Sequence, residues 1–265
     1  MTILEIESSG FVAAGGHRLE YVLYPGRRRP TLVFLHEGLG CVSLWRDFPA
    51  RVALATGCRT LVYSRYGYGR YDVLAAPRRP DYMHVEALEV LPEVLRRFEI
   101  ERPVLIGHSD GASIALIHGG DGRWQCAGIA VLAPHVFVEE ISLRGIAETV
   151  KVFETTDLPQ KLARHHQDAR RTFYGWADIW RHPDFRTWNI EECLPGLRCR
   201  VLAIQGEDDE YASMAHLERI AAAALDAPDV DQRRLADCRH SPHRDQADAV
   251  LAAVAGFVGR VAQMS

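Results

Sequence analysis

Residues 107–111 have the sequence GHSDG, in which a serine has a glycine two positions away on each side. This motif follows the apolar run Val104 to Ile106 and precedes the helical pattern Ala112 to His118. A serine in such a strand-to-helix turn projects its hydroxyl above the edge of a sheet, and the glycines avoid clashes that side chains would cause. The first N–H groups of the following helix point towards the same turn. Ser109 is therefore a candidate nucleophile.

A second glycine-containing segment, HEGLG at residues 36–40, also follows an apolar run. Backbone N–H groups at the end of a strand can stabilise negative charge that develops on an oxygen. Gly38 and Leu39 are candidate donors of this kind, together with the N–H of Asp110, which follows the serine. We expect His36 and His108 to pack or form hydrogen bonds beside this site. A simple glycine-rich turn is the alternative.

Two further segments supply an acid and a base. The sequence GEDDE at residues 206–210 follows an apolar run, and an acid there can accept a hydrogen bond from the Nδ1–H of a histidine. The four acids could equally form a solvated loop, and the residues alone do not separate Asp208 from Asp209. His240 precedes the last helical pattern and would complete the chain order Ser, Asp, His. His243 is the local competitor.

Short apolar runs alternate with longer amphipathic stretches along most of the chain. Runs that are apolar throughout are typical of strands in a parallel sheet that is covered on both faces. Such strands are predicted at residues 31–35, 60–63, 104–106, 128–132 and 201–204, with outer strands at 19–23 and 233–235. Helical spacing of apolar residues is found at residues 45–55, 83–98, 112–118, 140–153, 158–173, 214–225 and 244–261. The alternation predicts an α/β fold with a doubly wound, mostly parallel sheet.

Residues 134–195 interrupt this alternation. They contain no convincing strand, show short helical patterns and are rich in aromatic residues. We expect them to form a helical cap over the carboxyl edge of the sheet, with residues 1–133 and 196–265 as the core. Trp176 and Trp180 are then candidate substrate-binding residues.

The composition limits the classes of function. The chain has 265 residues and a formal net charge of −4, so it lacks the basic excess of nucleic-acid-binding proteins. No apolar run approaches the roughly 18 residues of a membrane helix, and the N-terminus does not resemble a signal peptide. The six cysteines form no C-x-x-C pair, which predicts free thiols and no zinc site. We expect a cytoplasmic protein without a nucleic-acid or membrane partner.

The sequence resembles the α/β-hydrolase superfamily over essentially its whole length. The segments that carry the resemblance are residues 36–38, SRYGYG at 64–69, residues 107–111, residues 206–209 and His240. The resemblance implies an α/β-hydrolase fold with a helical cap. In this superfamily the acid usually lies three residues after the glycine, so the implied catalytic triad is Ser109, His240 and Asp209. It requires no metal and no organic cofactor.

Glu37 departs from the family pattern, because many relatives have a glycine after the histidine of this loop. An additional carboxylate there would repel an oxyanion unless it is neutralised, points away or contacts the substrate. We expect an ion pair with Arg65 or Arg70. The functional alternative is that Glu37 accepts a hydrogen bond from a hydroxyl or ammonium group of the substrate.

These features predict a serine hydrolase that cleaves a small or medium acyl substrate, namely a carboxylic ester, lactone or thioester, through an acyl-enzyme on Ser109. Carbon–carbon bond hydrolysis, cofactor-free oxygenase or lyase chemistry, and a non-catalytic ligand-binding role are the alternatives. The expected partner is a small-molecule substrate, and the protein is expected to be a monomer or homodimer.

Overall fold

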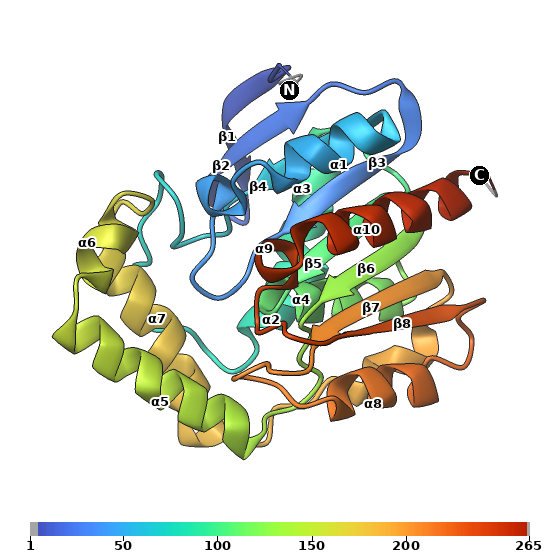
Figure 1. The fold of residues 1–265 in the computed structure, drawn as a ribbon. Coiled ribbons are helices and arrows are strands. Elements are labelled where there is room, and N and C mark those ends of the chain that lie inside the picture. Colours follow the sequence, from blue (N-terminus) through green and yellow to red (C-terminus); the bar gives the residue numbers. More distant parts are fainter. Residues whose placement is uncertain (1–4, 264–265) are drawn as a thin grey trace.

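The computed structural model describes residues 5–263, which form one sheet with helices packed against both faces (Figure 1). The eight strands lie in the order β1-β2-β4-β3-β5-β6-β7-β8. Neighbours from β4 to β8 are parallel, whereas β2 is antiparallel to both β1 and β4. The strands are β1 (Ser8–Ala14), β2 (His17–Tyr24), β3 (Arg28–Leu35), β4 (Cys58–Tyr63), β5 (Val104–His108), β6 (Gly128–Leu132), β7 (Arg200–Gly206) and β8 (Val230–Leu235). The predicted doubly wound, mostly parallel sheet is confirmed.

The two faces of the sheet are covered by different helices. Along β3, Leu32 and Phe34 belong to one apolar cluster, whereas Val33 and Leu35 belong to the other. This alternation follows from the period of two in a strand, and it explains why central strands are apolar throughout. The first cluster includes residues of α1 (Phe48–Thr56) and α10 (Ala247–Ala262). The second includes residues of α3 (Leu91–Arg97), α4 (Asp110–Gly120) and α8 (Ala215–Ala223).

Several element boundaries differ from the sequence-based expectations. Strand β1 was not predicted; it lies at the sheet edge, and most of its residues are exposed or half-buried, so its apolar signal is weak. The predicted helix at residues 83–98 comprises α2 (Tyr82–Val85), a π-helical turn η2 (Glu86–Val90) and α3. The predicted helix at residues 244–261 comprises α9 (Pro242–Asp245) and α10. The 3-10 helix η1 (Val42–Trp45) precedes α1.

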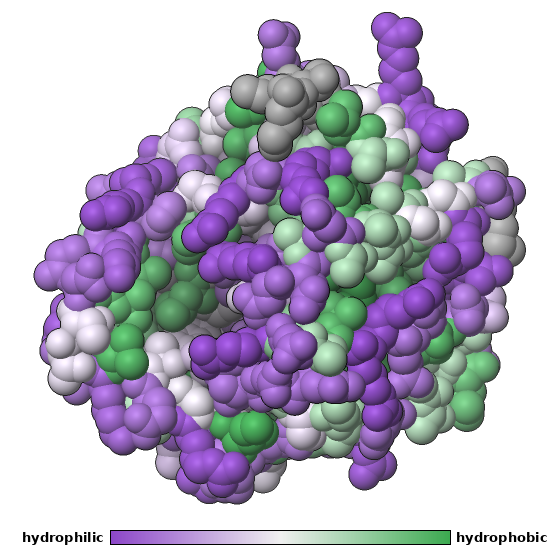
Figure 2. Space-filling model, in the orientation of Figure 1, coloured by the Kyte–Doolittle hydropathy of each residue, from purple (hydrophilic) through white to green (hydrophobic). Residues whose placement is uncertain are grey.

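The chain between β6 and β7 contains three helices that lie apart from those covering the sheet (Figure 1). They are α5 (Glu140–Thr155), α6 (Leu158–Ala163) and α7 (Ala169–Arg181), followed by 3-10 helices η3 (Pro183–Phe185) and η4 (Glu191–Gly196). The predicted helix at residues 158–173 is broken, because Asp168 begins a new helix by accepting a hydrogen bond from the N–H of Arg171 at 2.9 Å. The molecule is hollowed between these helices and the sheet, with hydrophobic residues inside the hollow (Figure 2).

Glu139 connects the start of α5 to Ser213, which precedes α8, and to His216 within α8. Its carboxylate accepts hydrogen bonds from the N–H of Ser213 at 2.9 Å, the hydroxyl of Ser213 at 2.6 Å and Nε2–H of His216 at 2.9 Å. Partial burial would raise the pKa of Glu139, but the hydrogen bonds from His216 and Ser213 outweigh it and lower this pKa to about 2. The carboxylate therefore stabilises the folded chain.

We expect Glu139→Gln to lower the free energy of unfolding at pH 7 by about 1–2 kcal/mol, since the carboxylate accepts three hydrogen bonds but is partly solvated. Because the folded pKa is lowered, this stabilisation is complete above the ordinary pKa of 4.5 and is lost as the pH falls towards 2. Urea unfolding of both proteins at pH 7 and pH 3 measures it. A difference between them that is as large at pH 3 as at pH 7 would contradict this role.

Within residues 5–263, no helix is both long enough and apolar enough to cross a bilayer.

Candidate active site

Ser109 lies in a strained turn between β5 and α4. Its backbone has φ 52° and ψ −117°, outside the conformations that residues with side chains normally adopt. The flanking glycines are required by close backbone contacts. A Cβ atom on Gly107 would lie 2.3 Å from the carbonyl oxygen of Gly111, and one on Gly111 would lie 2.0 Å from that of Leu35. The GHSDG sequence thus places the serine at the carboxyl edge of the sheet.

His240 lies between Ser109 and Asp209. Its Nε2 is 3.0 Å from the Oγ of Ser109, and its Nδ1 is 2.8 and 2.9 Å from the two carboxylate oxygens of Asp209. The Nδ1–H therefore donates to Asp209, which leaves Nε2 able to accept the serine proton. The three residues come from the ends of β5 and β7 and from the loop after β8, which meet because the strands are parallel.

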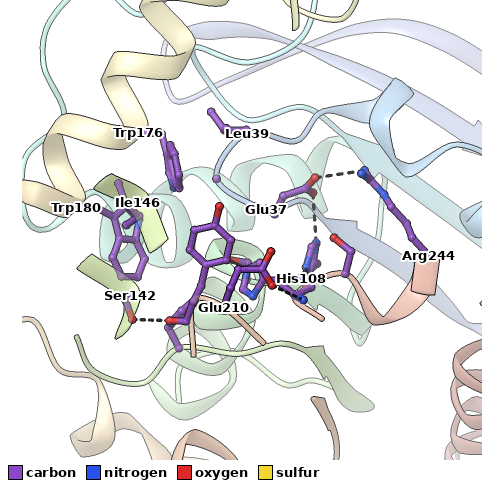
Figure 3. Close-up of a pocket in the computed structure, with 15 residues that line it drawn as sticks. Glu37, Leu39, His108, Ser142, Ile146, Trp176, Trp180, Glu210 and Arg244 are labelled. Carbon is purple, nitrogen blue, oxygen red and sulfur yellow. Dashed lines mark hydrogen bonds and ion pairs between the residues drawn. The ribbon is translucent and has the colours of Figure 1, made fainter. Parts of the chain in front are cut away.

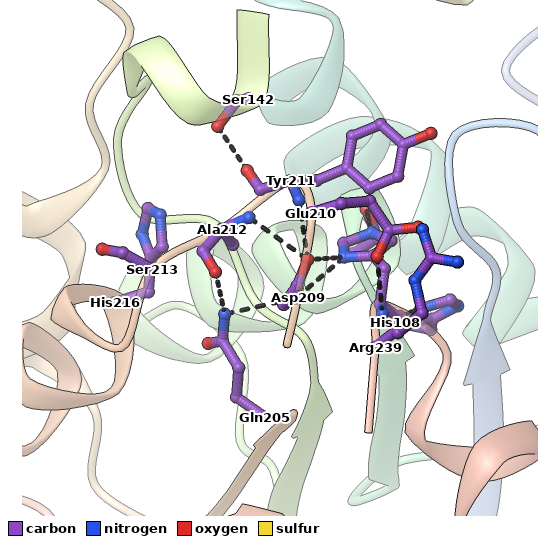
Figure 4. A network of polar contacts seen from close by, with 12 residues as sticks. His108, Ser142, Gln205, Asp209, Glu210, Tyr211, Ala212, Ser213, His216 and Arg239 are labelled. Atoms are coloured by element: carbon purple, nitrogen blue, oxygen red, sulfur yellow. Dashed lines mark hydrogen bonds and ion pairs between the residues drawn. The ribbon is translucent and has the colours of Figure 1, made fainter. Parts of the chain in front are cut away.

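Asp209 is held by its own hydrogen bonds (Figure 4). Its Oδ1 accepts from the N–H groups of Tyr211 at 2.8 Å and Ala212 at 3.2 Å, and its Oδ2 accepts from Nε2 of Gln205 at 3.2 Å. Burial would raise the pKa of Asp209, but the charge and hydrogen bond of His240 and the N–H groups of Tyr211 and Ala212 lower it. Burial would lower the pKa of His240, and the Asp209 carboxylate raises it instead.

Asp208 and His243, the alternative candidates for the acid and the base, lie away from Ser109. Asp208 is exposed, whereas Asp209 has only 6% of its surface exposed. The ring of His243 packs 4.9 Å from that of Trp45, between centroids, in the apolar layer under α1 and α10. The structure therefore brings Asp209 and His240 to Ser109, and places Asp208 and His243 away from this contact.

A cavity of about 280 Å³ opens beside Ser109 (Figure 3). One part of its wall is apolar and includes Leu39, Ile146, Trp176 and Trp180. The other part is polar. The lining residues are Glu37, Gly38, Leu39, His108, Ser109, His135, Ser142, Ile146, Trp176, Trp180, Glu210, Tyr211, His240, Ser241 and Arg244. The two tryptophans singled out in the sequence thus line the same cavity as Ser109.

The loop that follows β3 is fixed by two histidines and a buried arginine. His36 is fully buried; its Nδ1–H donates to the carbonyl of Glu37 at 2.7 Å, and its Nε2 accepts from the N–H of Arg65 at 3.0 Å. His166 donates from Nε2 to the carbonyl of Leu39 at 3.0 Å. These contacts hold Gly38 and Leu39 at the wall of the cavity.

Glu37 does not pair with Arg65 or Arg70, so the expected ion pair is wrong. Its carboxylate lies 3.5 Å from the guanidinium of Arg244 and 3.5 Å from Nδ1 of His108 (Figure 3). Arg65 instead donates to the main-chain oxygen of Glu37 at 3.0 Å. Burial would raise the pKa of Glu37, but His108 and then Arg244 outweigh it and keep this pKa well below its usual value. The carboxylate is therefore ionised, and its negative charge is balanced by the guanidinium of Arg244.

The backbone and the side chain of Asp110 have different surroundings in the site. Its backbone lies at the N-terminus of α4, directly after Ser109, whereas its side chain is fully buried behind the cavity. There it accepts hydrogen bonds from the hydroxyl of Tyr82 at 2.7 Å and from Nε1 of Trp180 at 3.3 Å, and lies 3.7 Å from the guanidinium of Arg65. Trp180 of α7 is thereby linked to the turn that carries the serine.

Sequence reasoning missed several residues of the cavity wall. Glu210, Tyr211, Ser241 and Arg244 lie within four positions of Asp209 or His240, so a search of the flanking sequence would have found them. The remaining missed residues are His135, Ser142 and Ile146. The only signal for His135 was its position just after a predicted strand.

Gly38 lies directly against Trp176. A Cβ atom on Gly38 would lie 2.1 Å from Nε1 of Trp176, which is buried. We expect Gly38→Ala to displace this ring or the loop and to lower kcat/KM by about 10²-fold, the effect of misplacing a substrate by about 1 Å. Gly259→Ala is the control, because a Cβ atom there meets nothing within 4 Å. Equal kcat/KM values for the two variants would show that the loop tolerates the side chain.

No group of three or more metal-binding side chains was found in the described part of the chain.

Comparison with known proteins identifies the fold and family. A hydrolase of 2-hydroxy-6-oxo-6-phenylhexa-2,4-dienoate from Rhodococcus sp. strain RHA1 has a TM-score of 0.80 at 13% identity, over 98% of this chain and 100% of that one. An enol-lactonase from Burkholderia xenovorans LB400 has a TM-score of 0.73 at 20% identity, over 94% of this chain and 100% of that one. A carboxylesterase structure from Nitrososphaera gargenis has a TM-score of 0.75 at 17% identity, over 97% of this chain and 100% of that one.

At these identities the similarity concerns the fold alone. A comparison with curated protein sequences found no match. The sequence model of the alpha/beta hydrolase family matches residues 32–253, which include Ser109, Asp209 and His240. The chain therefore belongs to the alpha/beta hydrolase family.

Proposed function

We propose that this protein is a serine hydrolase that cleaves a small or medium carboxylic ester, lactone or thioester through an acyl-enzyme on Ser109. The observation that carries the proposal is the unbroken series of contacts from Asp209 through His240 to Ser109, which opens on a cavity of about 280 Å³. The distance of 3.0 Å between Nε2 of His240 and Oγ of Ser109 allows proton transfer from serine to histidine, and the contact with Asp209 orients the imidazole for it.

In the proposed reaction, His240 removes the proton of Ser109 as its Oγ attacks the acyl carbonyl. Asp209 holds the imidazole with Nδ1–H towards itself and stabilises the imidazolium that forms. The N–H of Asp110 and an N–H of the Gly38–Leu39 segment stabilise the oxyanion. His240 then protonates the leaving group. In the second half of the reaction, His240 takes a proton from water as the water oxygen attacks the acyl carbonyl. It returns this proton to the Oγ of Ser109 as the Ser109–acyl bond breaks and the acid is released. These side chains and N–H groups suffice without a metal or cofactor.

We further propose that residues 134–195 act as a cap that limits the size of the substrate. Trp176 and Trp180 of α7 line the apolar part of the cavity. A cavity of about 280 Å³ lies near the lower end of the range for small-molecule sites. This size favours a small or medium acyl substrate over a polymer.

The names of the structural neighbours indicate which substrates to screen first. They include an enol-lactonase, a carboxylesterase and a hydrolase of 2-hydroxy-6-oxo-6-phenylhexa-2,4-dienoate. Esters and lactones test the proposal directly, and a diketone-like substrate tests carbon–carbon bond hydrolysis on the same three residues.

Reaction with a fluorophosphonate probe, followed by mass spectrometry of the adduct, tests for an activated serine. We expect the native protein to be labelled at Ser109, and His240→Ala to be labelled at least 10²-fold more slowly, because its serine has no base. Ser109→Ala controls for labelling elsewhere. A folded native protein that is not labelled, or is labelled equally fast without His240, would refute an activated nucleophile.

A further inference from the structure

His135 lies in the cavity wall close to the end of β6, the strand next to the one that leads to Ser109. Its backbone is held at two points. The hydroxyl of Ser113 in α4 donates to the carbonyl of His135 at 2.6 Å, and the N–H of the next residue, Val136, donates to Nδ1 of His216 at 3.2 Å. The backbone position of His135 is therefore set by the fold.

The ring of His135 is surrounded by other rings. Its centroid lies 5.0 Å from that of Trp180, 5.3 Å from that of His216 and 5.6 Å from that of His240. Only 2% of the residue is exposed. His135 thus lies between the candidate base and the apolar part of the cavity, where Trp180 and Ile146 lie side by side (Figure 3).

Neither ring nitrogen of His135 has a hydrogen-bond partner among residues 5–263. Its Nδ1 is completely buried without one. Its Nε2 does not belong to that completely buried, unpaired group, so Nε2 is the nitrogen that the cavity exposes. Nε2 therefore faces the space that a substrate would fill, whereas Nδ1 stays unpaired whether or not a substrate is bound.

The imidazole of His135 carries a single proton, and the burial of Nδ1 determines which ring nitrogen holds it. Burial keeps the pKa of His135 well below its usual value, so the ring is neutral at pH 7. A proton on Nδ1 would be a buried N–H without a partner, which is rarer in proteins than an unpaired acceptor. The proton therefore lies on Nε2, and His135 offers a hydrogen-bond donor to the cavity.

Two other polar side chains of the cavity wall, Ser142 and Glu210, are already paired within the protein. The hydroxyl of Ser142 donates to the carbonyl of Tyr211 at 2.6 Å. The carboxylate of Glu210 accepts from the N–H of His240 at 3.2 Å and lies 3.0 Å from the guanidinium of Arg239. His135 differs from these residues because its donor has no partner.

We infer that His135 is a specificity-determining residue whose Nε2–H donates a hydrogen bond to an oxygen that the substrate carries in addition to its scissile carbonyl. The inference rests on the proposed function, because it concerns the substrate of that reaction. The substrate class is an acyl compound with a hydroxyl or keto oxygen near the carbonyl that Ser109 attacks. An unsubstituted alkanoyl ester leaves the donor unpaired.

The test compares 4-nitrophenyl butanoate with its 2-hydroxy, 3-hydroxy and 3-oxo derivatives. His135→Phe keeps a ring of similar size for packing on Trp180 but removes the donor. His135→Gln carries an amide N–H that reaches approximately to the position of Nε2. The ratio of variant to wild-type kcat/KM for each ester cancels differences in intrinsic reactivity between the esters.

We expect His135→Phe to lower kcat/KM about tenfold for at least one oxygenated ester and less than threefold for the butanoate. His135→Gln should restore most of the loss. A uniform loss for all four esters, or no loss for any, would refute a specificity role. The first of these outcomes is the one that a purely structural role of the histidine predicts.

A binding measurement separates this inference from the proposed function. In Ser109→Ala, which cannot form an acyl-enzyme, binding of butanoate and its three oxygenated analogues is followed by fluorescence of the cavity tryptophans. Tighter binding of an oxygenated acid, abolished by adding His135→Phe, supports the inference even if no ester is hydrolysed. If esters are hydrolysed at Ser109 but His135→Phe changes neither binding nor selectivity, the proposed function stands and this inference fails.

Discussion

Replacing Ser109 or His240 by alanine is expected to lower kcat for ester hydrolysis by 10⁴-fold or more, on the order of the losses that follow removal of a nucleophile or its base. The reason is the direct contact between them, in which Nε2 of His240 lies 3.0 Å from the Oγ of Ser109. Neither residue can perform its step alone, because the serine needs a base and the base needs a proton to remove.

The double variant Ser109→Ala/His240→Ala should therefore be little slower than either single variant. Steady-state kinetics on 4-nitrophenyl butanoate, with thermal unfolding as the control for folding, gives all three rates. Losses that multiply in the double variant would indicate that the two residues act independently. A single variant that keeps more than a tenth of the native kcat would refute the role assigned to that residue.

Asp209→Asn is expected to lower kcat about 10³–10⁴-fold without unfolding the protein, because the asparagine amide no longer fixes the tautomer of His240. The exposed neighbour Asp208 provides a matched control. Asp208→Asn should leave kcat within threefold of the native value, since the structure places Asp208 away from the histidine. Equal effects of the two substitutions would contradict the choice of acid.

The pH dependence of kcat/KM gives a second test of the contact between Asp209 and His240. Burial lowers and the Asp209 carboxylate raises the pKa of His240, with a net increase above the ordinary value of 6.5. His240 must be neutral to act as a base, so kcat/KM of the native protein should rise with pH through this raised pKa. In Asp209→Asn the pKa falls, and the acidic limb of the profile should move to lower pH while its plateau drops. An acidic limb that moves to higher pH would show that Asp209 does not stabilise the imidazolium.

Local sequence patterns were sufficient to predict those features that depend on interactions between residues close in the chain. The central strands of the sheet are apolar throughout because both faces are covered, and this can be read from five or six consecutive residues. Ser109 could be identified because a strained turn with close backbone contacts demands glycine at positions 107 and 111. Edge strand β1 was missed for the converse reason, since its partly exposed residues carry little apolar signal.

The choice between Asp208 and Asp209 illustrates the limit of local patterns. From the residues alone the two acids were equivalent, and only the family spacing favoured Asp209. In the structure, the chain after β7 turns so that Asp209 accepts hydrogen bonds from two backbone N–H groups and faces His240, whereas Asp208 faces solvent. The difference is one of side-chain direction, which composition does not encode.

The sequence by itself determined the α/β fold, the strand-to-helix turn at Ser109 and the chain order of serine, acid and histidine, because each depends on the identity and spacing of neighbouring residues. The tertiary structure decided which distant side chains meet. It paired Glu37 with Arg244 and His108, whereas Arg65 and Arg70 had been expected. It also placed the unpaired imidazole of His135 in the cavity wall. Such contacts arise where separate loops converge at one edge of a parallel sheet, and the distance along the chain says nothing about them.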